Sequence, residues 1–173
     1  EQGGLCCYTG RRITSKTSHI EHLKPQKLCI NHEDTDYSNL LAAFPAPNTP
    51  KACEYGAHAR KSWFNKRLFV HPLRTDCEHR FRYTLNGKVT PAEPKDDGAK
   101  ETIYQLRLDH RELKAMRKQA IYELLFAKKL RKSQVRRLMI AMDERDSNGL
   151  FHQFCFVLKQ ACEKYLKQFD KAK

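Results

Sequence analysis

The sequence predicts an α+β protein in which a small β-containing part is followed by a helical part. Between Cys77 and Thr90, apolar and polar residues alternate around an Asn-Gly pair, which is typical of a β-hairpin. After residue 110, apolar residues recur every three or four positions along three stretches, which is typical of amphipathic helices. We expect two domains, one over 1–94 and one over 95–173, because the composition changes near residue 95.

Local signals in the amino-terminal part predict, in order, a turn, a strand, a short helix or loop, and a helix. The segments are CCYTGRRI at 6–13, SHIEHLKP at 18–25, DYSNLLAAF at 36–44 and CEYGAHARKSWFN at 53–65. Prolines in PAPNTP, at 45–50, predict a stiff turn. The hairpin follows, with Asn86-Gly87 at its turn, and PAEPKDDGAK at 91–100 is expected to be a polar linker.

Three helices are expected beyond this linker. Asp109, followed three residues later by Glu112, resembles a capping box at the start of the first helix. The second helix is predicted over about 132–145, ending in a DSNG turn, and the third over about 150–169. Lysine and arginine fill KKLRKSQVRR, at 128–137, which we interpret as a solvated helix face, a phosphate-binding surface or a docking site for an acidic partner.

The charge balance favours a polyanionic partner. The chain has 33 lysine and arginine residues against 20 acidic ones, a net charge of +13, so nucleic acid is the first candidate and acidic lipid or protein the second. Seven irregularly spaced cysteines without a secretory signal indicate thiols or metal ligands of a cytoplasmic protein. No apolar run is long enough for a membrane helix, and we expect the natural protein to begin earlier, because no initiator methionine is present.

A set of polar residues in the first part has the composition of a catalytic site. Glu21 and His22 precede a Leu-Lys-Pro step, and Asn39, His58 and Asn65 follow at wider spacing. An imidazole can accept a proton near pH 7, and a carboxylate can hold a divalent ion. The alternative is that these are ordinary polar residues at a strand end, with Asn39 capping a helix. His19 alternates with Glu21 and would be a third ligand or a hydrogen-bonded histidine.

This order of residues resembles the HNH, or ββα-metal, nucleases, whose signature is an acidic residue and histidine before a hydrophobic-x-Pro step, a central asparagine, and a final histidine or asparagine. Most of the chain is similar to one group, the PtuB-type HNH subunit of Septu-type and retron-associated phage-defence systems. The matching segments are SHIEHLKPQ, DTDYSNLLAAF, CEYGAHARKSW, FVHPLRTDCEHRFRYTLNGKV, ETIYQLRLDHRELKAMRK and GLFHQFCFVL. The resemblance implies a ββα-metal core extended by a hairpin and followed by a helical bundle.

The resemblance also implies a role for each residue of the set. His22 would be the general base, Glu21 a metal ligand, and Asn39 the residue that fixes the loop orienting His22. His58 would be the second metal ligand of the catalytic centre, with Asn65 as the alternative on the same helix. The expected metal is Mg²⁺ or Mn²⁺.

Two further expectations concern cations and cysteines. Arg60 or Lys61, close to His58 in the sequence, would bind the scissile phosphate. Related HNH proteins often hold a structural zinc ion between two Cys-x-x-Cys knuckles, but here Thr9 stands three residues after Cys6. A mixed zinc site that uses Cys6, Cys53 and a histidine is one interpretation, and small buried thiols are the other.

The implied activity is endonucleolytic cleavage of nucleic acid by the toxic effector of a phage-defence complex. DNA is the usual substrate of this class, and RNA, including tRNA, stays open. The implied partners are an SMC/ABC-like ATPase and, in retron contexts, a reverse transcriptase with its multicopy single-stranded DNA. The helical part would dock the partner. The alternative is a degenerate, non-catalytic HNH fold that binds nucleic acid or acts as a scaffold, which Thr9 favours.

Overall fold

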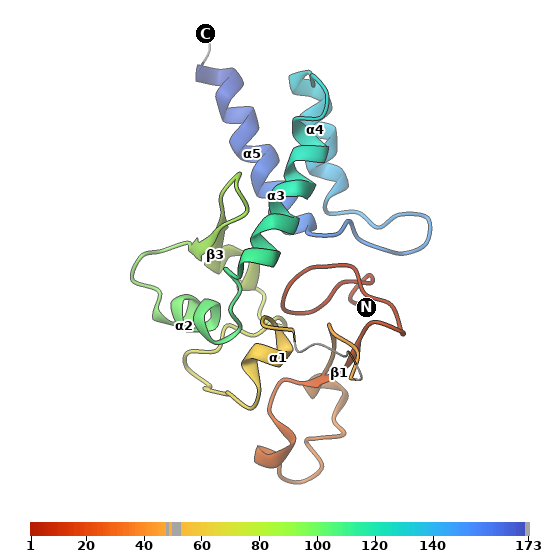
Figure 1. Ribbon diagram of the computed structural model, residues 1–173, viewed down its shortest axis with the longest axis vertical. Coiled ribbons are helices and arrows are strands. Elements are labelled where there is room, and N and C mark those ends of the chain that lie inside the picture. The colour runs from red at the N-terminus through yellow and green to blue at the C-terminus, as the bar shows by residue number, and fades with distance from the viewer. Residues whose placement is uncertain (48, 50–52, 172–173) are drawn as a thin grey trace.

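The structure is a computed structural model that describes residues 1–47, 49 and 53–171. Within these residues the chain is α+β, with two separate antiparallel sheets (Figure 1). The strands are β1 His19–His22, β2 Leu40–Ala43, β3 Phe81–Tyr83 and β4 Val89–Pro91, and the helices are α1 Ala57–Arg60, α2 Asp97–Gln105, α3 Arg111–Leu125, α4 Lys132–Ala141 and α5 Cys155–Lys171. Short 3-10 turns occupy Gln26–Leu28, Tyr37–Asn39 and Cys77–Arg80. The proline-containing stretch at 45–50 lies partly outside the described residues.

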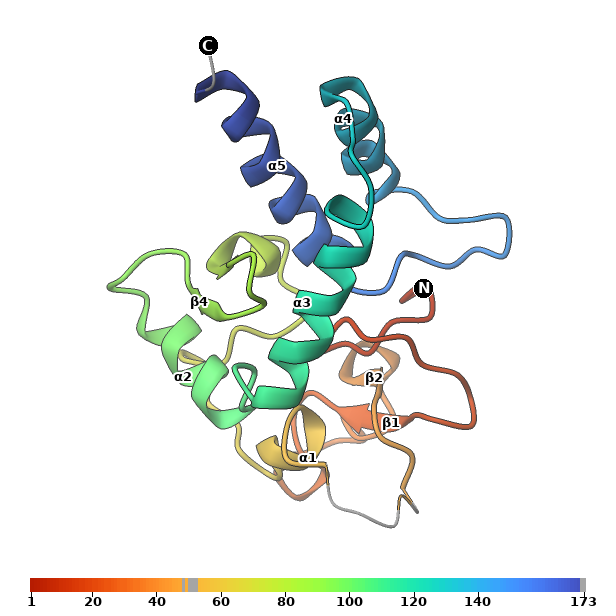
Figure 2. The same ribbon diagram turned by 45° about the horizontal axis from the view of Figure 1, so that its top comes forward.

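The elements form two regions that lie along the long axis of the molecule (Figure 1). The first sheet and α1 occupy one end, and α4 and α5 project at the other, with α3 leading from the first region toward the second (Figures 1 and 2). Helix α5 packs against both α3 and α4. None of the described helices is both long enough and apolar enough to span a lipid bilayer.

The first sheet pairs β1 with β2, so that Glu21 lies opposite Leu41 and His22 opposite Leu40. The strand predicted at 18–25 is confirmed. The segment at 36–44, expected to be a short helix or loop, instead forms one 3-10 turn and then β2. Its apolar residues are placed by pairing with β1, a tertiary contact that outweighs their local helix propensity.

Helix α1 is much shorter than the sequence predicts. It begins after Gly56, which has φ +68°, and it ends at Lys61, which has φ +52°. A left-handed backbone at Lys61 cannot continue a right-handed helix. Asn65 therefore does not lie on this helix, and the expectation that it follows His58 on one helix face is wrong. Its side chain instead accepts hydrogen bonds from the backbone N–H groups of Arg67 and Leu68.

The hairpin is confirmed, and its tip lies against α3. Gly87 has φ +81°, and a Cβ built there would lie 2.2 Å from the carbonyl oxygen of Lys114. Glycine is required because of both the backbone angle and the close approach. The predicted capping box is displaced by one residue. His110 caps α3 by accepting from the N–H of Glu112, whereas Asp109 accepts from Val89 of the hairpin at 3.1 Å.

Helix α2 begins inside the stretch expected to be a linker. Asp96 caps it by accepting from the N–H of Ala99 at 2.9 Å, and the same carboxylate pairs with Arg80 in the turn before β3. Ala99 and Thr102 are buried, and Thr102 donates to the carbonyl of Leu68 at 3.1 Å. The linker prediction is wrong because an N-cap and a buried face together stabilise a helix that propensity alone disfavours.

One hydrophobic core crosses the predicted boundary at 94/95. It joins Ala43 and Phe81 on one side of that boundary to Leu106 and Val157 on the other. Two backbone hydrogen bonds reinforce it: Phe151 donates to Gly3 at 3.0 Å, and Phe154 donates to Gly10 at 2.8 Å. The two regions are therefore packed as one unit.

We expect Asp96→Ala to lower the free energy of unfolding by about 1–2 kcal/mol, because it removes the N-cap of α2 together with the ion pair to Arg80. Asp96→Asn keeps a capping oxygen and should cost less. Arg80 holds the pKa of Asp96 below its usual range, so the ion pair stabilises the fold above the carboxyl's unfolded pKa and is lost as the pH falls through the lower folded value.

Urea denaturation across the acidic range checks this. The difference in unfolding free energy between wild type and Asp96→Asn should be constant near neutrality and shrink below about pH 4. A difference that is independent of pH would contradict the role of the ion pair.

Candidate active site

A cavity of about 590 Å³ lies between β1 and α1. Alternate residues of a strand share a face, so β1 directs His19 and Glu21 to the same side, and α1 supplies His58. The lining residues are His19, Glu21, Cys53, Glu54, Ala57, His58, Ala59, Lys61 and Arg107. Two predicted metal ligands, Glu21 and His58, and one predicted phosphate-binding residue, Lys61, are therefore brought together.

Arg60 lies behind this cavity, inside the protein. It is only 2% exposed, and it forms a buried ion pair with Glu21. Its guanidinium also donates to Tyr8 Oη at 2.9 Å, to Trp63 O at 3.1 Å, and to the backbone carbonyls of His22 and Leu23. Because the guanidinium is buried and its donors are taken up by acceptors inside the protein, it is not available to a phosphate in solvent. The structure therefore does not place Arg60 in the predicted phosphate-binding role.

Glu21 is held at both carboxylate oxygens. Oε1 accepts from Arg60 and, at 3.0 Å, from Tyr8 Oη, while Oε2 lies 3.3 Å from His19 Nε2 on the cavity side. Burial raises the pKa of Tyr8 well above its usual value, so that its hydroxyl stays a neutral donor. The other ring nitrogen of His19 faces the carbonyl of Pro45. Both ring nitrogens of His19 therefore face oxygen acceptors.

His22 belongs to a different hydrogen-bond network and does not line this cavity. Its Nε2 lies 3.0 Å from the backbone carbonyl oxygen of Asp34. A carbonyl only accepts, so Nε2 carries the proton and Nδ1 keeps the lone pair that a general base needs. Glu21 and His22, which the resemblance assigns to one catalytic site, do not face one cavity, because they are successive residues of a strand and point to opposite sides.

Asn39 fixes the loop that holds His22. Its Nδ2 donates to the carbonyls of Glu33 and Lys24, at 2.9 and 3.2 Å, and its Oδ1 accepts from the N–H of Lys24 at 2.7 Å. The side chain is buried, with the residue 8% exposed. Asn39 thus connects the end of β1 to the loop that carries the Asp34 carbonyl, which is the geometry expected of a residue that orients His22.

The two candidates for the second ligand are placed differently. His58 Nδ1 accepts from the backbone N–H of Cys53 at 3.3 Å, which leaves Nε2 for the cavity. Its ring centroid lies 6.3 Å from that of His19. Asn65 is exposed and is not among the residues that line the cavity. The geometry therefore favours His58 over Asn65 beside Glu21.

The cysteines of the suggested zinc site lie in different surroundings. Cys6 is buried and its sulfur accepts from the N–H of Phe44 at 3.4 Å, whereas Cys53 lines the cavity beside His58. A hydrogen bond from the Cys7 side chain is the main cause that lowers the pKa of Cys6 to about 6. Over residues 1–47, 49 and 53–171, no three His, Cys, Asp or Glu side chains are arranged to hold a metal ion.

Sequence reasoning missed three contributors to the site: Tyr8, Glu54 and Arg107. Tyr8 supports Glu21 from a turn 13 residues away. Arg107 lies 3.5 Å from Glu54, and both line the cavity, although 53 positions separate them in the sequence. No local pattern marks such residues, because contacts distant in sequence bring them to the site, such as the hydrogen bond from Gly56 to the carbonyl of Leu106 at 2.8 Å.

Comparison with known proteins does not identify a family. No protein-family model matches the chain, and no curated protein matches its sequence.

We expect Arg60→Met to lower the free energy of unfolding by about 3–5 kcal/mol, because it leaves the Glu21 carboxylate buried without its cation. Arg60→Lys should also destabilise, because an ammonium group cannot reach all of the acceptors. The double variant Arg60→Met with Glu21→Gln should recover part of the loss. Chemical denaturation of wild type, Arg60→Met, Glu21→Gln and the double variant checks this, and strictly additive effects of the two substitutions would contradict the coupling.

Proposed function

We propose that this protein is a metal-dependent endonuclease of the HNH type that hydrolyses phosphodiester bonds in nucleic acid. The observation that carries the proposal is the placement of His22. The Asp34 carbonyl fixes its tautomer, Asn39 fixes the loop, and the next residue back along β1, Glu21, lines a cavity with two further histidines.

His22 acts as the general base in this proposal. Hydrolysis of a phosphodiester requires that a water molecule lose its proton as it attacks phosphorus, and an imidazole nitrogen with a free lone pair can accept that proton near pH 7. The Asp34 carbonyl holds the proton of Nε2 and leaves Nδ1 unprotonated. Asn39 is a positioning residue, since it acts on His22 only through the loop.

The cavity beside Glu21 would hold the metal ion in this proposal. Because His22 faces the other side of β1, the scissile phosphate would have to lie at the end of the strand to be within reach of both residues. His19, Glu21 and His58 offer two imidazoles and one carboxylate, a donor set that suits Mn²⁺ and, less well, Mg²⁺. When bound, the ion would stabilise negative charge on the phosphate and the leaving oxygen. Arg60 pairs with Glu21 and orients it, with Oε2 toward the cavity, and the exposed Lys61 is the cation that would bind the phosphate.

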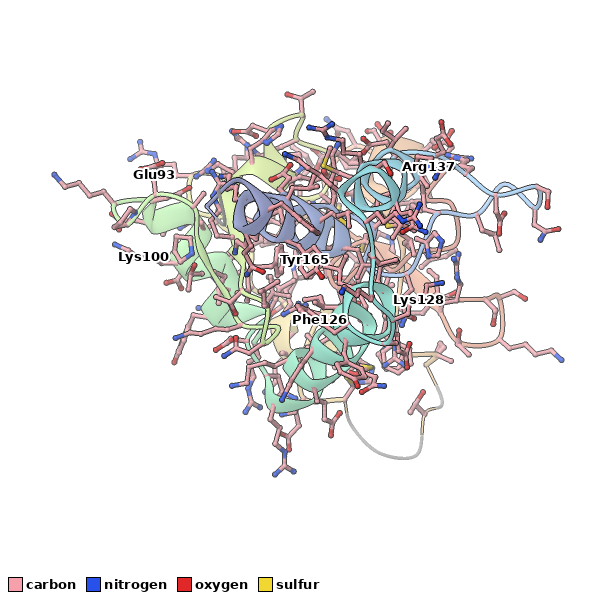
Figure 3. All side chains as sticks on the ribbon, turned by 90° about the horizontal axis from the view of Figure 1, so that it is seen from above. Glu93, Lys100, Phe126, Lys128, Arg137 and Tyr165 are labelled. Carbon is pink, nitrogen blue, oxygen red and sulfur yellow. The ribbon has the colours of Figure 1, made fainter. Side chains whose placement is uncertain are left out.

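The biological setting is proposed from the resemblance. The protein would be the cytoplasmic toxic effector of a phage-defence complex, acting with an SMC/ABC-like ATPase and, in retron contexts, a reverse transcriptase with its multicopy single-stranded DNA. We place the partner at the free end of the helical region, where exposed Phe126 packs edge-on against Tyr165 between α3 and α5 (Figure 3). Lys128 and Arg137 are exposed nearby, which favours an acidic partner surface.

A second candidate function is a non-catalytic scaffold or nucleic-acid-binding subunit with a degenerate HNH fold. Two observations favour it. His22 does not line the cavity of Glu21, and within the described residues no three ligand side chains are arranged to hold an ion.

A cleavage assay separates the two functions. We expect the wild type with Mn²⁺ or Mg²⁺ to cut DNA or RNA, and His22→Ala to lower the rate about 100- to 10,000-fold, the contribution typical of a general base. His58→Ala should also lower it and should weaken the dependence on metal concentration. His152→Ala is the matched control, because His152 is exposed and lies outside the site.

Thermal unfolding confirms that each variant is folded, and a chelator should abolish cleavage by the wild type. No cleavage by the wild type would support the scaffold and contradict the nuclease. Equal cleavage by wild type and His22→Ala would contradict the assignment of His22 as the general base.

A further inference from the structure

A second hollow, of about 920 Å³, adjoins the candidate active site. It shares Glu54, Ala59 and Arg107 with the cavity of Glu21, so the two form one continuous groove. The added part runs along α2 and the start of α3, and both ribbon views place α2 beside α1 (Figures 1 and 2). The groove therefore leads away from the candidate catalytic residues over a surface to which the proposed reaction assigns no role.

The wall of this groove is fixed to the site by backbone contacts. Gly56, just before α1, donates to the carbonyl of Leu106 at the end of α2, at 2.8 Å. Leu106 and Leu108 are buried, at 0% and 4% exposure. Arg107, between them, has φ +48° and is exposed toward the groove. The side chains that line this part are thus held at a set distance from α1.

Tyr104 presents an aromatic ring in this groove. It is 74% exposed, although it lies on α2 one turn from the buried core. Lys100 lines the groove four positions earlier, on the same face of the helix, and extends outward from it (Figure 3). The Lys100 ammonium group pairs with Asp97 at 2.9 Å at the surface of the helix. An exposed ring beside a cation is the combination on which nucleotide bases stack while their phosphates bind the charge.

The charges along the groove are mainly positive. Arg107 and Arg111 line the outer part, and Lys61 lines the inner cavity. Three acids also line it: Glu21, Glu54 and Asp109. Glu21 pairs with the buried Arg60. Glu54 lies 3.5 Å from Arg107 and 3.2 Å from His110, while Asp109 accepts from the backbone N–H of Val89. The acids therefore partly neutralise the groove without reversing its sign.

We propose that this groove binds a single strand of nucleic acid, with one unpaired base stacked on Tyr104 and its phosphates passing Arg107 toward the cavity of Glu21. A duplex keeps its bases stacked inside, so it offers Tyr104 no free face unless a base is unpaired or flipped out. That the bound strand is also the substrate rests on the proposed function, whereas binding itself does not.

Fluorescence anisotropy on the full chain tests the proposal. The probes are labelled oligonucleotides of about 12 nucleotides, a usual footprint for such surfaces, as single-stranded DNA, single-stranded RNA and duplex DNA. Measurements are made on His22→Ala without added metal, so that cleavage does not interfere. We expect one or both single strands to bind more tightly than the duplex.

Tyr104→Ala should weaken single-strand binding about 5- to 150-fold, the loss of one stacked base, and Tyr104→Phe should keep most of it. Tyr37→Ala is the matched control: Tyr37 is 71% exposed but lies outside the groove, so its removal should leave affinity unchanged. Arg111→Ala should reduce the dependence of affinity on salt concentration.

Unchanged affinity of Tyr104→Ala, or an equal loss in Tyr37→Ala, would overturn the proposal, and so would duplex binding as tight as that of both single strands. The proposed nuclease activity is tested separately, by the cleavage assay that compares wild type with His22→Ala. Binding that depends on Tyr104 without cleavage would retain the groove and reject the nuclease.

Discussion

A single buried guanidinium, that of Arg60, determines how the candidate site is assembled. It closes α1 against β1 by binding the Glu21 carboxylate and the carbonyls of the two residues that follow, His22 and Leu23. Removing a guanidinium from water is costly, and the cost is offset here because Nε, Nη1 and Nη2 all find acceptors. The same contacts that satisfy Arg60 set the distance between the strand and the helix, and therefore the shape of the cavity.

The side chains of the proposed metal ligand, Glu21, and of the proposed base, His22, are positioned by different contacts. Glu21 is positioned through Arg60 and Tyr8, whereas His22 is positioned through the Asp34 carbonyl and the loop that Asn39 holds. Glu21 and His22 are neighbours in one strand, but their side chains are held by different parts of the chain.

The sequence predicted correctly those secondary-structure elements that are determined by residues close together in the chain. The strand of His19 to His22, the Asn-Gly hairpin and the last helices follow from period, turn residues and amphipathic spacing. Contacts distant in sequence decided the rest. β2 exists because β1 pairs with it, and α1 stops early because Lys61 takes a left-handed backbone.

The same division applies to the site residues. The sequence indicated Glu21, His22, Asn39 and His58 as polar groups at suggestive spacing, and three of them have hydrogen-bond partners that suit a site. The sequence could not indicate that Arg60 is buried. An arginine next to a predicted metal ligand looks like a phosphate-binding residue, and only the structure shows that it contacts Glu21, 39 positions away in the sequence. For the same reason, Asn65 could not be separated from His58.

The amino-terminal segment joins two parts of the molecule that are far apart in the sequence. Gln2 exchanges two hydrogen bonds with Ala42 of β2, at 2.7 and 3.0 Å, while Gly3 and Gly10 accept from Phe151 and Phe154 before α5. The segment thus contacts β2 of the sheet that bears Glu21, through Gln2, and the turn before α5, through Gly3 and Gly10. The sheet that bears Glu21 and the turn before the terminal helix therefore meet on one short stretch of chain, which does not line the cavity.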